Sequence, residues 1–422
     1  MAMIRTFLRF LLSAVGGLWL STGAAEVAEL SVDQAVALAL QHYPALSEQQ
    51  VRVQALEQTV VQQTSLPDPR LSLGLTNVPV NSLSLSEEPM TMMEIGLSQP
   101  LPYPGKRGLL QGQARAMQEA GVQELSEARL QVASEVRQTW WARYGVDRAR
   151  EILTYNQELL RQIVGIAQTK YKVGQGLQQD VLLAQLELSK LLERDLMLKR
   201  EALALQYRLN RLIGQAPEAE LWLPGKTDTV LPNLRPVAQL VEAAMAARPQ
   251  LRAQQARVRA SEKGVELARR DYYPDFEVGA SYGQRSGYDD MVSVMFSMNL
   301  PIYTARKQDP MLAQRNSEVL GERYRLEDIQ AQIAARVREL VARYDEARAR
   351  VALLKTGILP QARQTVDSML AGYQVGKVDF LALTGAEVTQ FDYETQYWQT
   401  YSEAQQTLAA LQAEVGEESI HE

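Results

Sequence analysis

The sequence predicts a mainly helical fold built from an internally duplicated helix–strand–strand–helix–helix unit. Three observations support this prediction. The 422-residue chain contains long stretches without proline in which apolar residues recur at helical spacing. Between these stretches lie short segments in which apolar and polar residues alternate, as they do in strands. Motifs of the first half of the chain recur in the second half in the same order.

The recurrence indicates a duplicated chain, because ordered matches at nearly constant spacing are rare between unrelated segments. The matched positions are Pro44 and Pro249, Pro67 and Pro274, Asp68 and Asp275, Pro100 and Pro301, Lys106 and Lys307, Tyr171 and Tyr373, and Gly174 and Gly376. The predicted parts are a first repeat at 26–214, a linker rich in Pro and Gly at 215–235, a second repeat at 236–415 and a C-terminal tail at 416–422.

The first 25 residues have the pattern of a cleaved secretory signal peptide. Arg5 and Arg9 precede or begin a short apolar run at 10–20, and small residues follow at 21–25. The run is too short to span a bilayer as a helix. The chain contains no cysteine, so neither a lipidated cysteine anchor nor a disulfide is available. We therefore expect an exported protein without a lipid anchor.

Capping residues, prolines and glycines define the expected helices. Ser31 can cap the first helix, Pro44 comes early enough to kink that helix rather than end it, and Pro67 ends it. Gly174 ends a second stretch that contains no proline and measures on the order of 100 Å. The expected helices are 31–65, 105–172 and 180–212 in the first repeat and 236–272, 304–374 and 379–414 in the second. Helices of this length must pack side by side in coiled-coil fashion.

Four segments alternate with period two, and their apolar positions share one face. In the first of them, Leu71, Leu73 and Leu75 alternate with polar or small residues. The expected strands are 70–78, 91–99, 275–283 and 291–299. An apolar outer face and a small or polar inner face are typical of transmembrane barrel strands. A half-buried soluble sheet packed on helices is the alternative.

Four strands cannot enclose a lumen, and lipid does not tolerate open sheet edges. Three copies of the chain would supply twelve strands, which lies within the known range of such barrels. Prolines mark the places where strand and helix meet and can redirect the chain there. These junction residues are Pro67, Pro100, Pro102, Pro274 and Pro301.

Composition excludes several classes of function. Lys and Arg number 44 against 50 Asp and Glu, and the net charge of −6 argues against a nucleic-acid partner. The two histidines lie far apart in sequence, and no nucleophile–base pair or phosphate-binding loop appears, so we expect no enzyme, no cofactor and no resident metal site. Methionines near the second and fourth strands could contact soft Cu(I). Met93 and Met298, however, fall on the predicted lipid face.

Two motifs connect this organisation to a known family. Tyr171-Lys172-Val173-Gly174 is followed by Asp180, and its copy Tyr373-Gln374-Val375-Gly376 is followed by Asp379. The second motif is Gln99-Pro100-Leu101-Pro102 followed by Pro104-Gly105-Lys106-Arg107. In this order, over about residues 30–415, the chain resembles the TolC-like outer membrane factor family, also called outer membrane efflux proteins. The second motif is similar to the CzcC-like and CusC-like branch, which exports heavy-metal cations.

The resemblance implies a homotrimer with a twelve-stranded outer-membrane barrel, continued by a long α-helical barrel that places most of the mass in the periplasm. It implies the exit duct of a tripartite efflux system, with a periplasmic adaptor protein and an inner-membrane pump of the resistance-nodulation-division type as partners. The implied cargo is a heavy-metal cation such as copper, silver, zinc, cobalt or cadmium. A drug-efflux or type I protein-secretion duct is an alternative within this fold, and a non-channel periplasmic coiled-coil scaffold is an alternative of another class.

The resemblance also assigns roles to the two helical hairpin tips, which would meet the adaptor at the periplasmic entrance. The tip residues are Tyr171, Val173, Gly174, Gly176, Tyr373, Val375, Gly376 and Lys377. A plain helix C-cap at each glycine is the alternative. In a trimer, Asp180 and Asp379 would each form a ring of carboxylates that favours cations at the aperture. Simple capping of the return helices is the alternative for these two aspartates.

Overall fold

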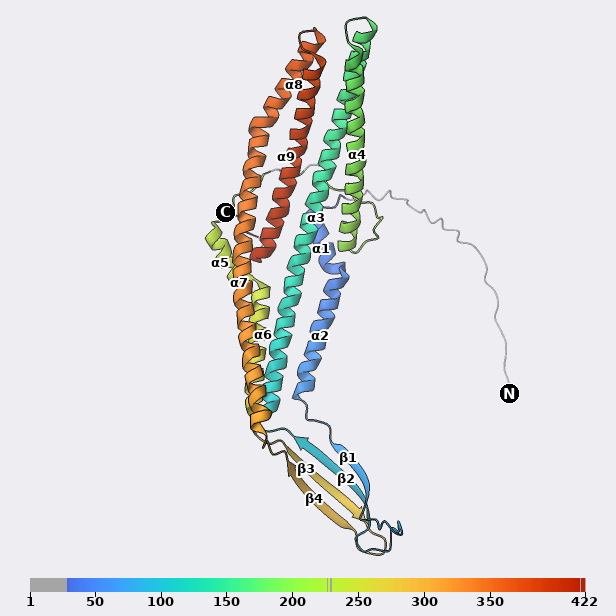
Figure 1. Cartoon of the computed structure of the whole chain (residues 1–422), viewed down its shortest axis with the longest axis vertical. Coiled ribbons are helices and arrows are strands. Elements are labelled where there is room, and N and C mark those ends of the chain that lie inside the picture. Colours follow the sequence, from blue (N-terminus) through green and yellow to red (C-terminus); the bar gives the residue numbers. More distant parts are fainter. Residues whose placement is uncertain (1–28, 226, 228–229, 418, 422) are drawn as a thin grey trace, which may run out of the picture.

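The computed structural model describes residues 29–225, 227, 230–417 and 419–421. The predicted signal peptide lies outside the described residues. Figure 1 shows an elongated molecule in which long helices run side by side and a small sheet lies at one end. Among the described helices, none combines the length and the apolar character needed to cross a bilayer.

The helices of the first repeat surround α3, which runs almost the whole length of the helical part (Figure 1). α3 packs against α2 and α4 of its own repeat and against α6 and α9 of the second repeat. The first repeat contains α1 (Val32–His42), α2 (Pro44–Thr64), α3 (Lys106–Lys172) and α4 (Gln178–Leu212). The second contains α5 (Val237–Ala247), α6 (Pro249–Arg270), the 3-10 turn η1 (Thr304–Arg306), α7 (Gln308–Leu353), the π-helical turn η2 (Leu354–Ile358), α8 (Leu359–Gln374) and α9 (Phe380–Val415).

Two of the predicted helices are each divided in two at a proline. At Pro44 only a kink was expected, and at Pro249 no interruption was expected. Pro44 begins α2 and Pro249 begins α6. The preceding residues, Tyr43 and Arg248, have ψ angles of 116° and 119°, which are extended rather than helical. The cause is the proline ring, which disfavours the helical conformation of the residue before it. The breaks fall at matched positions of the two repeats.

The helix predicted at 304–374 is also interrupted. η2 separates α7 from α8, and Pro360 lies at the start of α8. Proline has no N–H to donate and its ring crowds the preceding turn, so the wider π turn absorbs the mismatch without ending the rod. The prediction of one continuous helix overlooked Pro360.

The four strands form one antiparallel sheet in the order β1-β2-β3-β4. The strands are β1 (Arg70–Thr76), β2 (Met92–Leu101), β3 (Phe276–Gln284) and β4 (Met291–Met298). β1 and β2 come from the first repeat and β3 and β4 from the second, so the β2–β3 pairing joins the repeats. These bounds lie within a few residues of the predicted strands.

Buried side chains hold the helices together in several separate clusters along the rod. Trp140 of α3 is 2% exposed and stacks on Tyr144 with ring centroids 5.5 Å apart. The Trp140 indole N–H donates to the carbonyl oxygen of Leu30 at 2.9 Å, which ties the start of the described chain to α3. A second cluster joins α5, α6, α7 and α9 through Leu240, Leu251, Val337 and Leu411, respectively.

Candidate functional site

One face of the sheet carries an exposed band of apolar side chains that crosses all four strands. One row of this band consists of Leu73, Ile95, Tyr282 and Val292, each lying opposite the next on the neighbouring strand. These side chains are 74%, 48%, 45% and 74% exposed, respectively. Soluble proteins rarely leave so continuous an apolar surface uncovered, so this face is suited to contact a nonpolar phase.

The opposite face of the sheet is small or polar over most of its area. The row beside the one above consists of Ser72, Gly96, Ser281 and Ser293. Thr76 donates a hydrogen bond from its hydroxyl to the Glu94 carboxylate at 3.1 Å on this face. The sheet therefore separates an apolar side from a hydrophilic side.

The methionines near the strands divide between the two faces. Met93 and Met298 share the face of the apolar row, whereas Met291 and Met295 lie on the other face. All four are exposed. In the part of the chain that the structure describes, no group of three or more His, Asp or Glu side chains could hold a metal ion.

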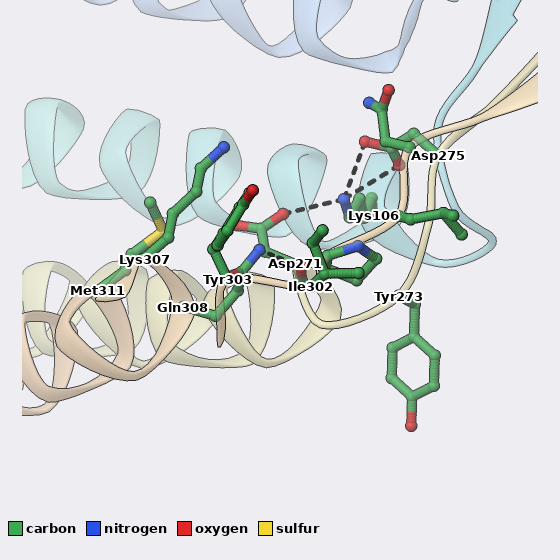
Figure 2. A pocket seen from close by; sticks show the side chains of 12 residues that line it. Lys106, Asp271, Tyr273, Asp275, Ile302, Tyr303, Lys307, Gln308 and Met311 are labelled. Atoms are coloured by element: carbon green, nitrogen blue, oxygen red, sulfur yellow. Dashed lines mark hydrogen bonds and ion pairs between the residues drawn. The ribbon is translucent and has the colours of Figure 1, made fainter. Parts of the chain in front are cut away.

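Where strand meets helix, an ionic joint connects the two repeats (Figure 2). The Lys106 ammonium at the start of α3 lies 2.9 Å from Asp271 and 3.0 Å from Asp275. The backbone N–H of Tyr103 donates to the Asp275 carboxylate at 2.7 Å. We call Lys106 with Asp271 and Asp275 the inter-repeat joint.

In the inter-repeat joint, two partly exposed acids neutralise the charge of a largely buried lysine. The Lys106 side chain is 9% exposed. Burial acts to lower the pKa of the ammonium, but the hydrogen bonds and charges of Asp271 and Asp275 outweigh burial and raise the pKa above its ordinary value. A cavity of about 550 Å³ lies beside the joint and includes Tyr303, Lys307 and Met311 in its lining (Figure 2).

The predicted junction prolines lie near this level of the molecule. Pro67 lies between α2 and β1, Pro102 between β2 and α3, Pro274 between α6 and β3, and Pro301 between β4 and η1. Pro100, by contrast, is still within β2, opposite Glu277 of β3. Sequence reasoning placed Lys106 in a motif but missed its contact with the aspartates, although the recurring Pro-Asp pair was a signal for Asp275.

Each hairpin tip ends in a left-handed glycine. Gly174 and Gly376 have φ angles of 74° and 76°. At the first tip, the Gly174 N–H donates to Tyr171 and the Gln175 N–H to Lys170, and the second tip repeats this pattern at Gly376 and Lys377. Both tips are therefore Schellman caps, which satisfy the last carbonyls of α3 and α8.

The two tips present different side chains to solvent. Val173 and Val375 are both exposed, but Tyr171 is exposed whereas Tyr373 is buried. Lys170 connects the hairpins, because its ammonium lies 4.1 Å from the centroid of the Tyr373 ring. Sequence reasoning did not identify this contact of Lys170.

The two aperture candidates occupy different positions. Asp379 caps α9 by accepting a hydrogen bond from the Ala382 N–H at 2.7 Å. Asp180 does not cap α4, which begins after Leu177 and has no side-chain cap. Burial and, to a lesser extent, the charge of Asp180 raise the pKa of the Tyr373 phenol.

A family comparison matches the chain over most of its length. The model of the outer membrane efflux protein family matches residues 35–215 and 240–417. The chain belongs to the outer membrane efflux protein family. This confirms the family that the sequence motifs predicted, whereas the metal-cation branch remains a prediction. The comparison with curated proteins found no match.

Solved channels share the fold of this efflux-family chain at low sequence identity. VceC from Vibrio cholerae is 17% identical with a TM-score of 0.78, over 92% of this chain and 96% of VceC. CusC is 15% identical with a TM-score of 0.79, over 93% of each chain. The open-state MtrE channel of Neisseria gonorrhoeae is 15% identical with a TM-score of 0.77, over 92% of this chain and 89% of MtrE. At these identities the likeness establishes the fold.

Proposed function

We propose that this protein is the outer-membrane exit duct of a tripartite efflux system and works as a homotrimer. The observation that carries the proposal is the four-stranded sheet with one exposed apolar face, one hydrophilic face and two unpaired edges, β1 and β4. Hydrocarbon does not tolerate unpaired backbone groups, so the edges require strands from other copies. Three copies give a closed barrel of twelve strands.

The long helices would continue this barrel as a tunnel through the periplasm. α3 and α4 form one hairpin and α8 and α9 form another, and both tips lie at the end of the molecule opposite the sheet (Figure 1). The exposed Val173 and Val375 at these tips suit docking of a periplasmic adaptor protein. The adaptor would join the duct to an inner-membrane pump of the resistance-nodulation-division type, which supplies the energy.

Heavy-metal cations are the proposed cargo. The motif from Gln99 to Arg107 supports this choice through its similarity to the CzcC-like and CusC-like branch. Asp180 and Asp379 lie near the tips, where three copies would bring their carboxylates around one entrance and favour cations. The cations would pass through as substrate, without a resident metal site.

Two measurements test the proposal. Extraction of the protein from cell membranes should require detergent. The purified protein should form ion-conducting pores in a planar bilayer. A protein that washes off membranes in high salt and conducts no ions would instead be a periplasmic scaffold. Deletion of the gene should sensitise cells to copper, silver, zinc, cobalt or cadmium. Unchanged metal tolerance with new sensitivity to drugs would overturn the metal cargo but keep the duct.

A further inference from the structure

The Lys106–Asp275 pair of the inter-repeat joint occurs once among the described residues, although the sequence places a lysine and an aspartate at the matched positions of both repeats. Lys106 and Asp275 form the joint 3.0 Å apart. Their counterparts in the other repeats are Lys307 and Asp68. Lys307 lies just before α7, as Lys106 begins α3, and Asp68 lies just before β1, as Asp275 precedes β3. The second pair thus occupies equivalent positions in the fold.

Lys307 and Asp68 are both exposed, and neither has an ion-pair partner among the residues that the structure describes. In Figure 2, dashed lines connect Lys106 to both aspartates, but none reaches Lys307. The two residues cannot meet within one chain, because β1 and β4 are the opposite edges of the sheet. Figure 1 likewise shows α2 and α7 on opposite flanks of the molecule.

Contacts inside each repeat show that the equivalence is structural. The Arg107 guanidinium donates to the carbonyl oxygen of Thr64 at the end of α2. The Gln308 amide donates in the same way to the carbonyl oxygen of Asp271 at the end of α6, at 3.3 Å. Arg107 and Gln308 directly follow the two lysines, and Thr64 and Asp271 each precede the matched aspartate by four residues. The within-repeat contact is therefore made twice, whereas the between-repeat contact is made once.

We infer that Lys307 of one copy forms an ion pair with Asp68 of the next copy and so closes the junction between barrel and tunnel. This inference rests on the proposed homotrimer and names a contact between neighbouring copies where the strands meet the helices. By the duplication, β4 corresponds to β2 and β1 corresponds to β3. Since β2 pairs with β3 inside the chain, the strand that pairs with the β4 edge is β1 of a second copy. The charges of Lys307 and Asp68 are complementary in the same sense as those of Lys106 and Asp275.

The same equivalence fixes the strand register between copies. Leu97 lies opposite Ala280 at the β2–β3 pairing. The corresponding residues at the β4–β1 pairing are Met298 and Leu73 of the next copy. Both belong to the exposed apolar band, so this register keeps the apolar face continuous across the boundary. The Thr304 N–H, which corresponds to that of Tyr103, would donate to Asp68 of the next copy.

The absence of cysteine from the sequence makes a crosslinking test direct. In the D68C/K307C variant, a short bismaleimide should link separate chains and give dimer and trimer bands on denaturing gels. The matched control K106C/D275C has the same spacing within one chain and should keep the monomer mass after crosslinking. Neither D68C nor K307C alone should form the intermolecular bands.

Charge reversal provides a second measurement. D68K and K307D should each lower the midpoint temperature of trimer dissociation by several degrees, and D68K/K307D should restore most of that loss. A trimer by native mass spectrometry that shows neither crosslinking nor charge rescue would overturn this ion pair but leave the exit duct intact. A protein that is monomeric in detergent and in membranes would overturn the trimer and the proposed function together.

Discussion

At the scale of single residues, two glutamates on α9 show how environment decides the behaviour of a carboxylate. Glu394 is held by the Arg363 guanidinium through two contacts of 3.0 and 2.9 Å. Glu387 lies two helical turns nearer the tip and is 8% exposed, yet one of its oxygens has no hydrogen-bond partner in the described chain. Burial without a compensating cation raises the pKa of Glu387 to about 7.

Glu387→Gln should stabilise the protein at alkaline pH. An unfolded glutamate has a pKa of about 4.3, so between that value and about 7 the folded chain binds more protons than the unfolded chain. Stability from this site is therefore complete below the unfolded pKa and is lost as pH rises through the folded pKa. The gain in unfolding free energy at pH 8 should be on the order of 2 to 3 kcal/mol, and it should vanish near pH 4.

Thermal unfolding measured against pH checks this prediction. Glu394→Gln is the matched control, since it breaks the pair with Arg363 and should lower rather than raise stability at pH 8. Parallel pH profiles of the wild type and Glu387→Gln would contradict the assignment.

Arg248 is a buried charge that, unlike Glu387, has partners of opposite charge. Arg248, which is 6% exposed in its side chain, lies 2.7 Å from Glu127 and 3.1 Å from Glu414. The matched position in the first repeat is occupied by the uncharged Tyr43, so the duplication did not predict a buried cation at position 248. Glu127 belongs to α3 and Glu414 to α9, so both partners of Arg248 come close to it only when the chain is folded.

Arg248→Ala should destabilise the protein by about 3 to 5 kcal/mol, because it leaves Glu127 buried without a partner. Arg211→Ala is the control, since its pair with Glu135 is exposed and should contribute at most about 1 kcal/mol. Denaturant unfolding of both variants measures the difference. Equal losses would show that the Arg248 cluster is not effectively buried.

At the scale of elements, prolines and glycines determine where the rods break. Periodicity and capping predicted the helices and strands to within a few residues, because these signals are local. The break at Pro44 was predicted only as a kink, and the break at Pro249 and the π turn before Pro360 were missed. The lateral contacts could not be predicted, because the Lys106 and Lys170 partners come from segments far away in the sequence.

The hairpin tips provide a prediction at this scale. Gly174→Pro and Gly376→Pro should abolish export while leaving trimers intact, because proline cannot adopt the positive φ of either cap. Gly165→Pro, in the body of α3, is the contrast, since it should disrupt the helix itself and lower overall stability. Export assays in whole cells, together with native mass measurement, distinguish these effects. Normal export by both tip variants would exclude a docking role for the tips.

At the scale of the whole molecule, the sheet divides the surface into two environments. Adjacent residues of β1 point to opposite faces, so Leu73 belongs to the apolar row and Ser72 to the hydrophilic one. The sequence alternation was sufficient to predict these faces. The sheet order, with both free edges at the flanks of one chain, became known only from the structure.

Leu73→Arg should impair membrane assembly, because a charge on the lipid face of a barrel costs about 2 to 4 kcal/mol near the bilayer centre. Ser72→Arg places the same charge one residue away, on the hydrophilic face, and should assemble normally. Membrane fractionation and the heat stability of the trimer report the outcome. Equal assembly of the two variants would argue against a lipid-facing row.

The pairing of β2 with β3 has a consequence for how the proposed ring would assemble and dissociate. Half of the boundaries between repeats would lie within a single polypeptide, because both strands of each β2–β3 pair are translated in one chain. In the proposed trimer, dilution would separate neighbouring copies only at the β4–β1 boundaries, where we place Asp68 and Lys307. The proposed trimer would therefore assemble in two association steps, whereas a ring of six single repeats would need five, and the two repeats would always be present in equal number.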